Sequence, residues 1–324
     1  MSEFLANILT GINSFIGNYG ISMILFTLIV KALLLPLEYK SRKGMRGMSK
    51  VQPEMKKLQT KYANDKEKLN QKMAELYRRE GVSPMSGCLP MILSMVVLWF
   101  MWGAMRSVAD GELINQCIEL LTTGTATNEG FLWIKNIWMP DSPFAPVIAD
   151  QNSLMMITAD KWSAAYAALT AEQVDVLTGL GLGADNFNSE SVFAALQTLP
   201  IYAEETKLWS VMPTLNLLIA NLSVYANNNG WFVLPILSAV TQFLMTKSQP
   251  QTAPADGQQN STNNFMKYFF PLFSLWICSS YNALFSLYWV ISNIIAAVQS
   301  VVMNKVMDNM DKKEKNIVKE GTVK

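Results

Sequence analysis

The sequence contains no histidine among its 324 residues, and it has only three cysteines. Without imidazole, histidine-based catalysis and histidine-ligated metal sites are excluded. Cys88, Cys117 and Cys278 cannot form a disulfide framework, so we expect packing roles, with Cys117 the one candidate for a reactive thiol. No glycine-rich segment resembles a phosphate-binding loop. The sequence therefore predicts no enzyme active site, no metal and no cofactor.

Charged residues are also scarce, at 16% of the chain against 50% hydrophobic residues. This balance is typical of a polytopic membrane protein. The net charge of +1 conceals an asymmetry, because residues 38–84 hold thirteen Lys/Arg and six Asp/Glu, whereas residues 106–230 hold four and thirteen. The asymmetry predicts that these two regions lie on opposite sides of the membrane.

Five apolar runs are long enough to be membrane-spanning helices. We predict spans at 19–37, 85–105 and 231–246, and two more within 265–304. The last two separate at Ser279–Asn282, because a tight hairpin needs turn-forming polar residues. A further span at 208–226 is the alternative, but it would move the basic C-terminal tail outside, against the charge rule. We therefore retain five spans.

The basic segments set the orientation. Residues 38–84, the loop 247–264 and the tail 305–324 share one side when five spans are counted, and the excess of Lys and Arg makes that side cytoplasmic. The N-terminus and residues 106–230 then lie outside. The loop 247–264 is rich in Pro, Gly and Gln and is predicted to be flexible, and the charged tail 305–324 is predicted to be disordered.

Two external elements are predicted. In residues 1–18, Phe4, Ile8, Ile12 and Phe15 recur at near-helical spacing, which indicates an amphipathic helix on the outer leaflet. Within the external loop 106–230, residues 147–229 predict a small, mostly helical insert of unknown role. One of its helices is expected to start at Thr170–Gln173. We expect the insert to be dispensable for folding, because loops tolerate changes of length.

The cytoplasmic segment 38–84 predicts a helical hairpin joined at Asn64–Asp65. Apolar residues recur every three or four positions on both sides of this joint, and Pro53 suits a first helical turn. The exposed faces are basic, with Lys56, Lys57, Lys61, Lys66, Lys68, Lys72, Arg78 and Arg79. These cations predict contact either with anionic lipid or with the phosphates of ribosomal RNA or a targeting factor.

Lys31 is the one charge inside the apolar run from Tyr19 to Leu37. A cation in the bilayer costs roughly 2.5–3.5 kcal/mol on insertion scales, and such residues are commonly functional. Lys31 either reaches toward the nearer interface or lines a polar groove. We favour the groove, with Lys31 as an uncompensated cation.

Together these segments resemble the YidC/Oxa/Alb family of membrane insertases. The residues that carry the resemblance are Val30–Pro36, Val51–Gln59, Met73–Tyr77, Gly81–Pro90, Phe131–Trp138, Leu234–Leu237 and Leu287–Asn293. They fall in the family's order and cover roughly 19–140 and 231–305, and as a set they are specific.

The resemblance implies an all-α, five-helix transmembrane bundle that encloses a polar groove, with a cytoplasmic helical hairpin. The groove's cation, usually arginine, corresponds to Lys31, which lacks a planar bidentate donor. Thr27 matches a polar groove position, and Tyr288 and Trp289 match aromatic positions that contact the nascent segment, although core packing also explains them. Ser94 and Gln242 are further groove candidates, for which helix packing is the alternative.

The resemblance further implies an insertase in the bacterial inner membrane, with the N-terminus outside and the C-terminus in the cytoplasm. Its expected partners are nascent membrane proteins, the ribosome, the signal-recognition-particle machinery, a Sec-type translocon and the lipid bilayer. A solute transporter or channel is the alternative from another class, but no internal repeat supports it. A scaffold that binds partners through the cytoplasmic hairpin is the third hypothesis.

Overall fold

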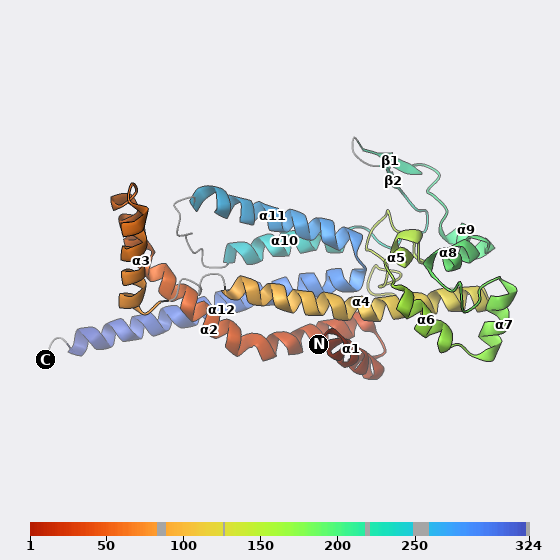
Figure 1. Ribbon diagram of the computed structural model, residues 1–324, viewed down its shortest axis with the longest axis horizontal. Coiled ribbons are helices and arrows are strands. Elements are labelled where there is room, and N and C mark those ends of the chain that lie inside the picture. Colours follow the sequence, from red (N-terminus) through yellow and green to blue (C-terminus); the bar gives the residue numbers. More distant parts are fainter. Residues whose placement is uncertain (83–88, 126, 218–220, 249–258, 322–324) are drawn as a thin grey trace. The chain divides into compact units, whose positions relative to one another are not determined.

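The computed structural model describes residues 1–82, 89–125, 127–217, 221–248 and 259–321. The described chain is mostly helical, as predicted, with two short strands (Figure 1). In chain order the elements are α1 (Ser2–Ile16), α2 (Tyr19–Lys61), α3 (Lys66–Glu80), α4 (Leu89–Thr123), α5 (Gln151–Met155), α6 (Ala159–Ala167), α7 (Ala171–Gly179), α8 (Ser189–Gln197), α9 (Pro200–Glu205), β1 (Thr214–Asn216), β2 (Asn221–Ser223), α10 (Val233–Ser248), α11 (Gln259–Ser280) and α12 (Ala283–Gly321).

The chain divides into two compact units, and five helices contribute residues to both. The first unit comprises Met1–Phe26, Trp99–Ser238 and Ser274–Trp289. The second comprises Thr27–Leu98, Ala239–Phe273 and Val290–Lys324. The helices with residues in both units are α2, α4, α10, α11 and α12.

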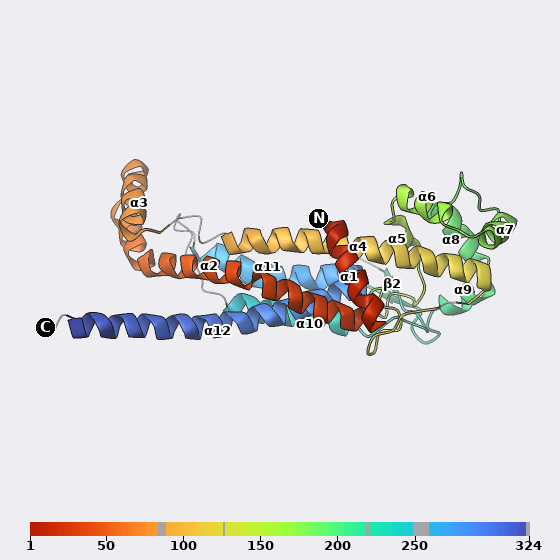
Figure 2. The same cartoon turned by 90° about the horizontal axis from the view of Figure 1, so that it is seen from below.

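In the first unit, α4 continues to Thr123, well past the predicted end of its span at residue 105. The added turns carry apolar residues at helical spacing, and Leu113, Ile114, Cys117 and Leu121 are all buried. Helices α5 to α9 gather beside this part of α4 (Figures 1 and 2). The insert therefore has a structural partner, which the sequence pattern did not indicate.

The insert has its own small core and regular helix starts. Trp162 on α6 is buried and packs edge-to-face against Phe187, with ring centroids 5.5 Å apart. Helix α7 begins as predicted, because Thr170 accepts a hydrogen bond from the Gln173 N–H and the Gln173 side chain accepts one from the Thr170 N–H. Strands β1 and β2 pair antiparallel with Leu215 opposite Leu222, within the stretch 208–226 that was the alternative span.

The turn predicted at Ser279–Asn282 lies between α11, which ends at Ser280, and α12, which begins at Ala283. The Asn282 side chain accepts a hydrogen bond of 2.9 Å from the Phe285 N–H and so caps the start of α12. The N–H groups of Ala283 and Leu284 donate to the carbonyls of Met139 and Ile137. This turn is thereby held against the segment that follows α4.

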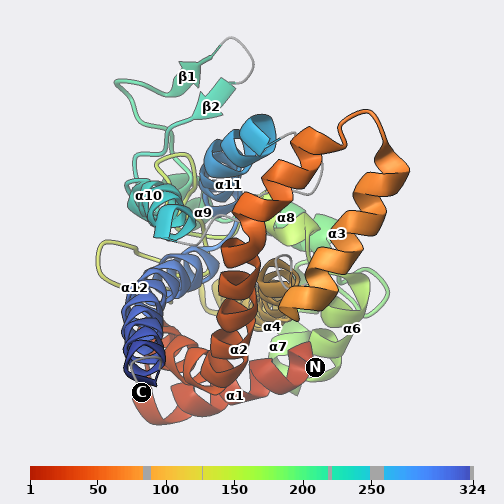
Figure 3. The same ribbon diagram turned by 90° about the vertical axis from the view of Figure 1, so that its left-hand side faces the viewer.

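In the second unit, the predicted helical hairpin forms, but not from two short helices. Helix α2 runs unbroken from Tyr19 to Lys61, so Pro53 lies inside it and not in a first turn. Helix α3 then turns back beside the end of α2 (Figure 3). Pro53 removes one backbone donor, but Val51 and Met55 on either side of it are buried in the seam between the two helices. Burial of these side chains keeps the helix continuous.

The predicted disordered tail is another correction. Helix α12 continues to Gly321, far beyond the predicted end of its span at residue 304. Asp308 and Asp311, which follow that end, form ion pairs with Arg46 and Lys50 of α2. Charges that favour disorder in isolation therefore extend the helix here, because α2 supplies the opposite charges.

Two of the described helices are long and apolar enough to cross a membrane, namely α2 and residues 283–312 of α12. Helix α10 has only 16 residues, fewer than a span of typical length needs. The flexible loop predicted at 247–264 falls mostly on residues 249–258, outside the described residues. The first residues of the predicted span 85–105, including Cys88, also lie outside them.

Candidate functional site

One face of α2 carries a row of polar and charged residues within the second unit. Thr27, Lys31, Glu38 and Arg42 follow one another at intervals of four, seven and four residues, which places them on one side of a helix. The other side is apolar and exposed, with Leu33 at 74% exposure. Helix α2 therefore has one polar and charged face and one exposed apolar face.

The Lys31 ammonium lies 3.4 Å from the Glu38 carboxylate, and the side chains are only 15% and 20% exposed. The prediction of an uncompensated cation is therefore wrong. Two turns of helix separate the residues, about 10 Å of axial rise, and the two flexible side chains together close that gap. A charge pair of this kind offsets part of the cost of placing Lys31 in an apolar segment.

Arg42 is a second buried cation, which the sequence reasoning missed. It is 8% exposed, and its Nη1 donates a hydrogen bond of 2.8 Å to the Ser300 hydroxyl of α12. The Ser300 hydroxyl in turn donates to the Ser248 carbonyl at 2.6 Å. The signal was present in the sequence, because Arg42 is eleven residues from Lys31 and three helical turns bring it back to the same face.

Polar residues of α10 and α12 are also buried in this unit. The Asn293 amide donates to the Thr241 hydroxyl at 3.4 Å, and both side chains are less than 9% exposed. Thr27 and Gln242, two predicted groove residues, are buried in the same unit as Lys31. Buried polar side chains on three helices mark this unit as polar inside.

The remaining groove candidates either belong to the other unit or have side chains outside the described residues. Tyr288 and Trp289 belong to the first unit, where both are buried, and the Trp289 ring packs edge-to-face with Phe285 at 5.6 Å. This contact agrees with the packing interpretation for Trp289. Ser94 lies in α4, in a stretch whose side chains are outside the described residues.

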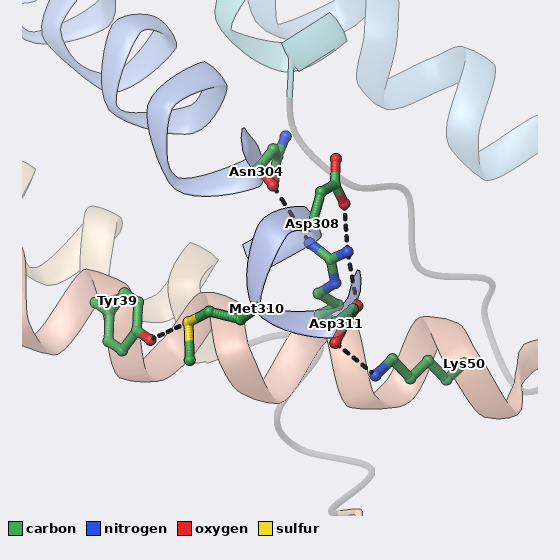
Figure 4. A network of polar contacts seen from close by, with 7 residues as sticks. Tyr39, Lys50, Asn304, Asp308, Met310 and Asp311 are labelled. Atoms are coloured by element: carbon green, nitrogen blue, oxygen red, sulfur yellow. Dashed lines mark hydrogen bonds and ion pairs between the residues drawn. The ribbon is translucent and has the colours of Figure 1, made fainter. Parts of the chain in front are cut away.

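An ion-pair network ties α2 to the end of α12. Arg46 pairs with Asp308 and with Asp311, and Lys50 pairs with Asp311 at 3.1 Å (Figure 4). The Tyr39 hydroxyl lies 3.8 Å from the Met310 sulfur. Hydrogen bonding from Lys50, assisted by the Arg46 charge, holds the pKa of Asp311 below its ordinary value. Arg46 and Lys50 extend the four-residue spacing that begins at Arg42, so one stripe of α2 carries all three cations.

The helical hairpin of α2 and α3 has an apolar seam and a basic exterior. Met48, Val51, Met55, Met73 and Leu76 form the buried seam. All eight predicted basic residues are exposed. Three of them already pair with carboxylates, because Lys68 contacts Asp65, Lys72 contacts Glu75 and Arg79 contacts Glu54. Among the described residues, no carboxylate pairs with Lys56, Lys57, Lys61, Lys66 or Arg78, so these five are the cations available to an external anion.

A second polar cluster, in the first unit, organises the segment after α4. Asp141 is fully buried and accepts hydrogen bonds from the Trp231 N–H at 2.9 Å and the Leu234 N–H at 2.7 Å. Asn229 is also fully buried, and its amide donates to the carbonyls of Asn136, Met139 and Pro140. Asp141 thereby satisfies backbone N–H groups at the start of α10, and Asn229 satisfies carbonyls of the segment after α4, so the cluster is structural.

The described residues contain neither a reactive thiol nor a cluster of metal-ligating side chains. Burial raises the pKa of the Cys117 thiol to about 12, so Cys117 is a packing residue and not a reactive one. No three His, Cys, Asp or Glu side chains in the described part of the chain lie together as metal ligands.

Comparisons with known proteins agree with the resemblance drawn from the motifs. A family model described as 60Kd inner membrane protein matches residues 11–181 and 190–312. A protein of Fusobacterium nucleatum named membrane protein insertase YidC is 45% identical over 107 residues, which is 33% of this chain and 52% of that protein.

Two relatives with the same name align over almost the whole chain. The protein of Pelodictyon phaeoclathratiforme is 27% identical over 305 residues, which is 94% of this chain and 36% of that protein. The protein of Chlorobaculum tepidum is 25% identical over 300 residues, which is 93% of this chain and 35% of that protein. The chain thus spans about half or less of the length of the relatives it matches. None of the three is named as a transporter, a channel or a scaffold.

Proposed function

Because the chain belongs to the 60Kd inner membrane protein family, we propose that it is a membrane protein insertase, which guides hydrophobic segments of nascent proteins into the bilayer. The proposal includes five membrane-spanning helices, with the N-terminus outside and the C-terminus in the cytoplasm. The spans would use parts of α2, α4, α10, α11 and α12. The excess of Lys and Arg in 38–84 supports this orientation.

The observation that carries the proposal is the charged face of α2 opposite its exposed apolar face. A nascent membrane segment needs both faces. Its apolar helix has to reach the lipid, and its polar tail has to cross the bilayer. Burial of the substrate's apolar side chains would supply the driving force, at roughly 25 cal/mol per Å². A polar face would lower the desolvation cost of the tail. No covalent step is needed.

Lys31 would attract acidic residues of the tail, since Coulomb attraction strengthens where the dielectric constant is low. The Lys31 ammonium already forms an ion pair with Glu38. An acidic substrate residue therefore has to displace Glu38, and the attraction depends on the pair and not on Lys31 alone. Thr27 and Gln242, which belong to the same unit as Lys31, would contribute neutral polar side chains to this face.

The cytoplasmic hairpin would bind the ribosome that delivers the substrate. Lys56, Lys57, Lys61, Lys66 and Arg78 are exposed without a carboxylate partner among the described residues, which suits contact with the phosphates of a ribosome. The tight apolar seam would keep the hairpin rigid while it binds. Further proposed partners are the signal-recognition-particle machinery and a Sec-type translocon.

The proposal is tested by reconstituting the purified chain into liposomes with a single-span substrate whose short tail carries either two Asp or two Asn. We expect protease-protected insertion of both substrates. Lys31→Ala combined with Glu38→Gln should lower insertion of the acidic tail more than that of the neutral tail, and Lys31→Arg should retain both. Lys43→Ala, on the same helix but exposed, is the control. Failure of the wild-type chain to insert either substrate would overturn the proposed function.

A further inference from the structure

Arg42 is a buried cation whose hydrogen-bonding capacity is mostly unused. A guanidinium has five N–H donors, yet the one hydrogen bond from Arg42 among the described residues is that from Nη1 to the Ser300 hydroxyl at 2.8 Å. No carboxylate of the described residues forms an ion pair with Arg42, although Glu38 acts on it electrostatically. Burying a cation without a paired anion is expensive. An anion at Arg42 would therefore be bound favourably.

Ser300 fixes the direction of the free donors. Its hydroxyl accepts from Arg42 and donates to the Ser248 carbonyl, so it joins α2, α12 and α10. One edge of the guanidinium is thereby held, and Nε and Nη2 remain for a bidentate ligand.

The position of Arg42 favours a carboxylate of the inserting segment over a lipid headgroup. Arg42 lies on the same face of α2 as Lys31 and Glu38, about 16 Å from Lys31 along the helix. The exposed apolar residues of this helix, such as Leu33 and Leu37, lie on the other side. A lipid phosphate would be expected beside that exposed side, whereas a substrate that follows the charged face passes Arg42.

We propose that Arg42, held by Ser300, is a second carboxylate-binding position, which an acidic substrate tail occupies before it displaces Glu38 from Lys31. This inference rests on the proposed insertase function. Glu38 lies between the two cations in sequence and interacts with both. When the substrate carboxylate moves to Lys31, Glu38 is free to turn toward Arg42. The exchange keeps each cation near one anion throughout, which avoids an unpaired buried charge.

The test compares insertion of the two tails, two Asp against two Asn, by variants in liposomes. Arg42→Gln should lower the ratio of acidic-tail to neutral-tail insertion about tenfold, the effect of one charge-assisted hydrogen-bonded pair. Arg42→Lys should retain only part of the ratio, because lysine keeps the charge but not the two parallel donors, and Ser300→Ala should lower the ratio by a smaller factor than Arg42→Gln. Arg79→Gln removes an exposed arginine that is paired with Glu54, and it should leave the ratio unchanged. A wild-type ratio in Arg42→Gln overturns the proposal.

A second measurement keeps Arg42 intact, in case Arg42→Gln does not accumulate. Ser300→Cys is introduced after Cys88, Cys117 and Cys278 have been replaced by Ala, and the substrate carries one Cys beside its acidic residues. With an added thiol oxidant to accept the two electrons, disulfide formation during insertion should be several-fold greater for the acidic tail than for the neutral tail. Equal or absent cross-linking of the two tails overturns the proposal.

The two proposals fail in different ways. If the wild-type chain inserts neither substrate, the insertase function fails. If it inserts both and the Arg42 and Ser300 results are negative, only the second carboxylate position fails. Anionic lipid is varied as a third arm, and a ratio that changes with lipid composition in wild type but not in Arg42→Gln would assign Arg42 to lipid and overturn the carboxylate assignment.

Discussion

The ammonium of Lys161 on α6 lies 2.8 Å from the Asp110 carboxylate on α4, and so joins the insert to the long helix beside it. Arg106 lies 3.8 Å from the same carboxylate. Even with two cations nearby, burial raises the pKa of Asp110 above its ordinary value, because desolvation outweighs the attraction. The pair therefore specifies where α6 docks more than it stabilises the fold.

The first prediction concerns the pH dependence that follows from this shift. A raised carboxyl pKa means that the folded state favours the protonated form of Asp110. The contribution of Asp110 to the free energy of unfolding is therefore fully present below pH 3.8 and is lost as the pH rises through the raised pKa. Asp110→Asn should therefore leave stability at pH 7 within about 1 kcal/mol of wild type or increase it, and should flatten the dependence between pH 4 and 7. Thermal unfolding in detergent measures both.

Asp160 provides a matched control with the opposite sign. It lies on the same helix as Lys161, and its hydrogen bond from Thr158 lowers its pKa. Asp160→Asn should therefore lower the free energy of unfolding at pH values above the ordinary carboxyl pKa. A large loss of stability at pH 7 in Asp110→Asn would show that the ion pair outweighs desolvation.

The second prediction concerns the turn before α10. A Cβ added to Gly230 would lie 2.0 Å from Asp141 Oδ1, which accepts from the Trp231 N–H. Gly230→Ala should displace that carboxylate and leave buried backbone donors unpaired, at a cost of about 1–3 kcal/mol. Gly111→Ala is the control, because nothing lies within 4 Å of its Cβ and alanine favours a helix. Equal melting temperatures for the two variants would contradict the structural role of Asp141.

The third prediction concerns the exposed cations of the hairpin. Neutralising Lys56, Lys57, Lys66 and Arg78 should weaken co-sedimentation with ribosomes and make the remaining binding less dependent on salt, because fewer counterions are released. Neutralising Lys68, Lys72 and Arg79 should have less effect, since each already pairs with a carboxylate. Leu76→Asp would instead open the seam and lower insertion while keeping every basic charge. Identical salt slopes for the two neutralised variants would assign the free cations to solvent or lipid.

The fourth prediction reverses an expectation drawn from the sequence. Deleting residues 147–229 with a Gly/Ser bridge should reduce accumulation in the membrane, because the deletion removes Asn229 and uncovers the apolar residues of α4. Leu196 and Tyr202 of the insert line the same small cavity as Cys117 and Leu120 of α4. Immunoblotting of membrane fractions, with Asn229→Ala alongside, measures the effect. Wild-type accumulation of the deletion would restore the earlier expectation of a dispensable insert.

Much of the local structure could be predicted from the sequence. The capping box at Thr170, the break at Ser279–Asn282 and the joint near Asp65 depend on side chains close to the backbone they bond, so short-range pattern suffices. The seam of the hairpin also followed from periodicity, since its members recur every three or four residues. Helix lengths were predicted less well, because α2, α4 and α12 all continue beyond their apolar runs.

The sequence by itself determined that the chain is mostly helical, that Lys31 stands in an apolar helix and that basic residues cover the hairpin. Only the tertiary structure decided which charges meet. Arg42 reaches Ser300 across 258 positions, and Arg46 reaches Asp308 across 262. Such pairs depend on how helices pack and not on spacing within one helix. The helical end of α12 and the contact between Arg42 and Ser300 therefore became visible only when α2 and α12 were placed side by side.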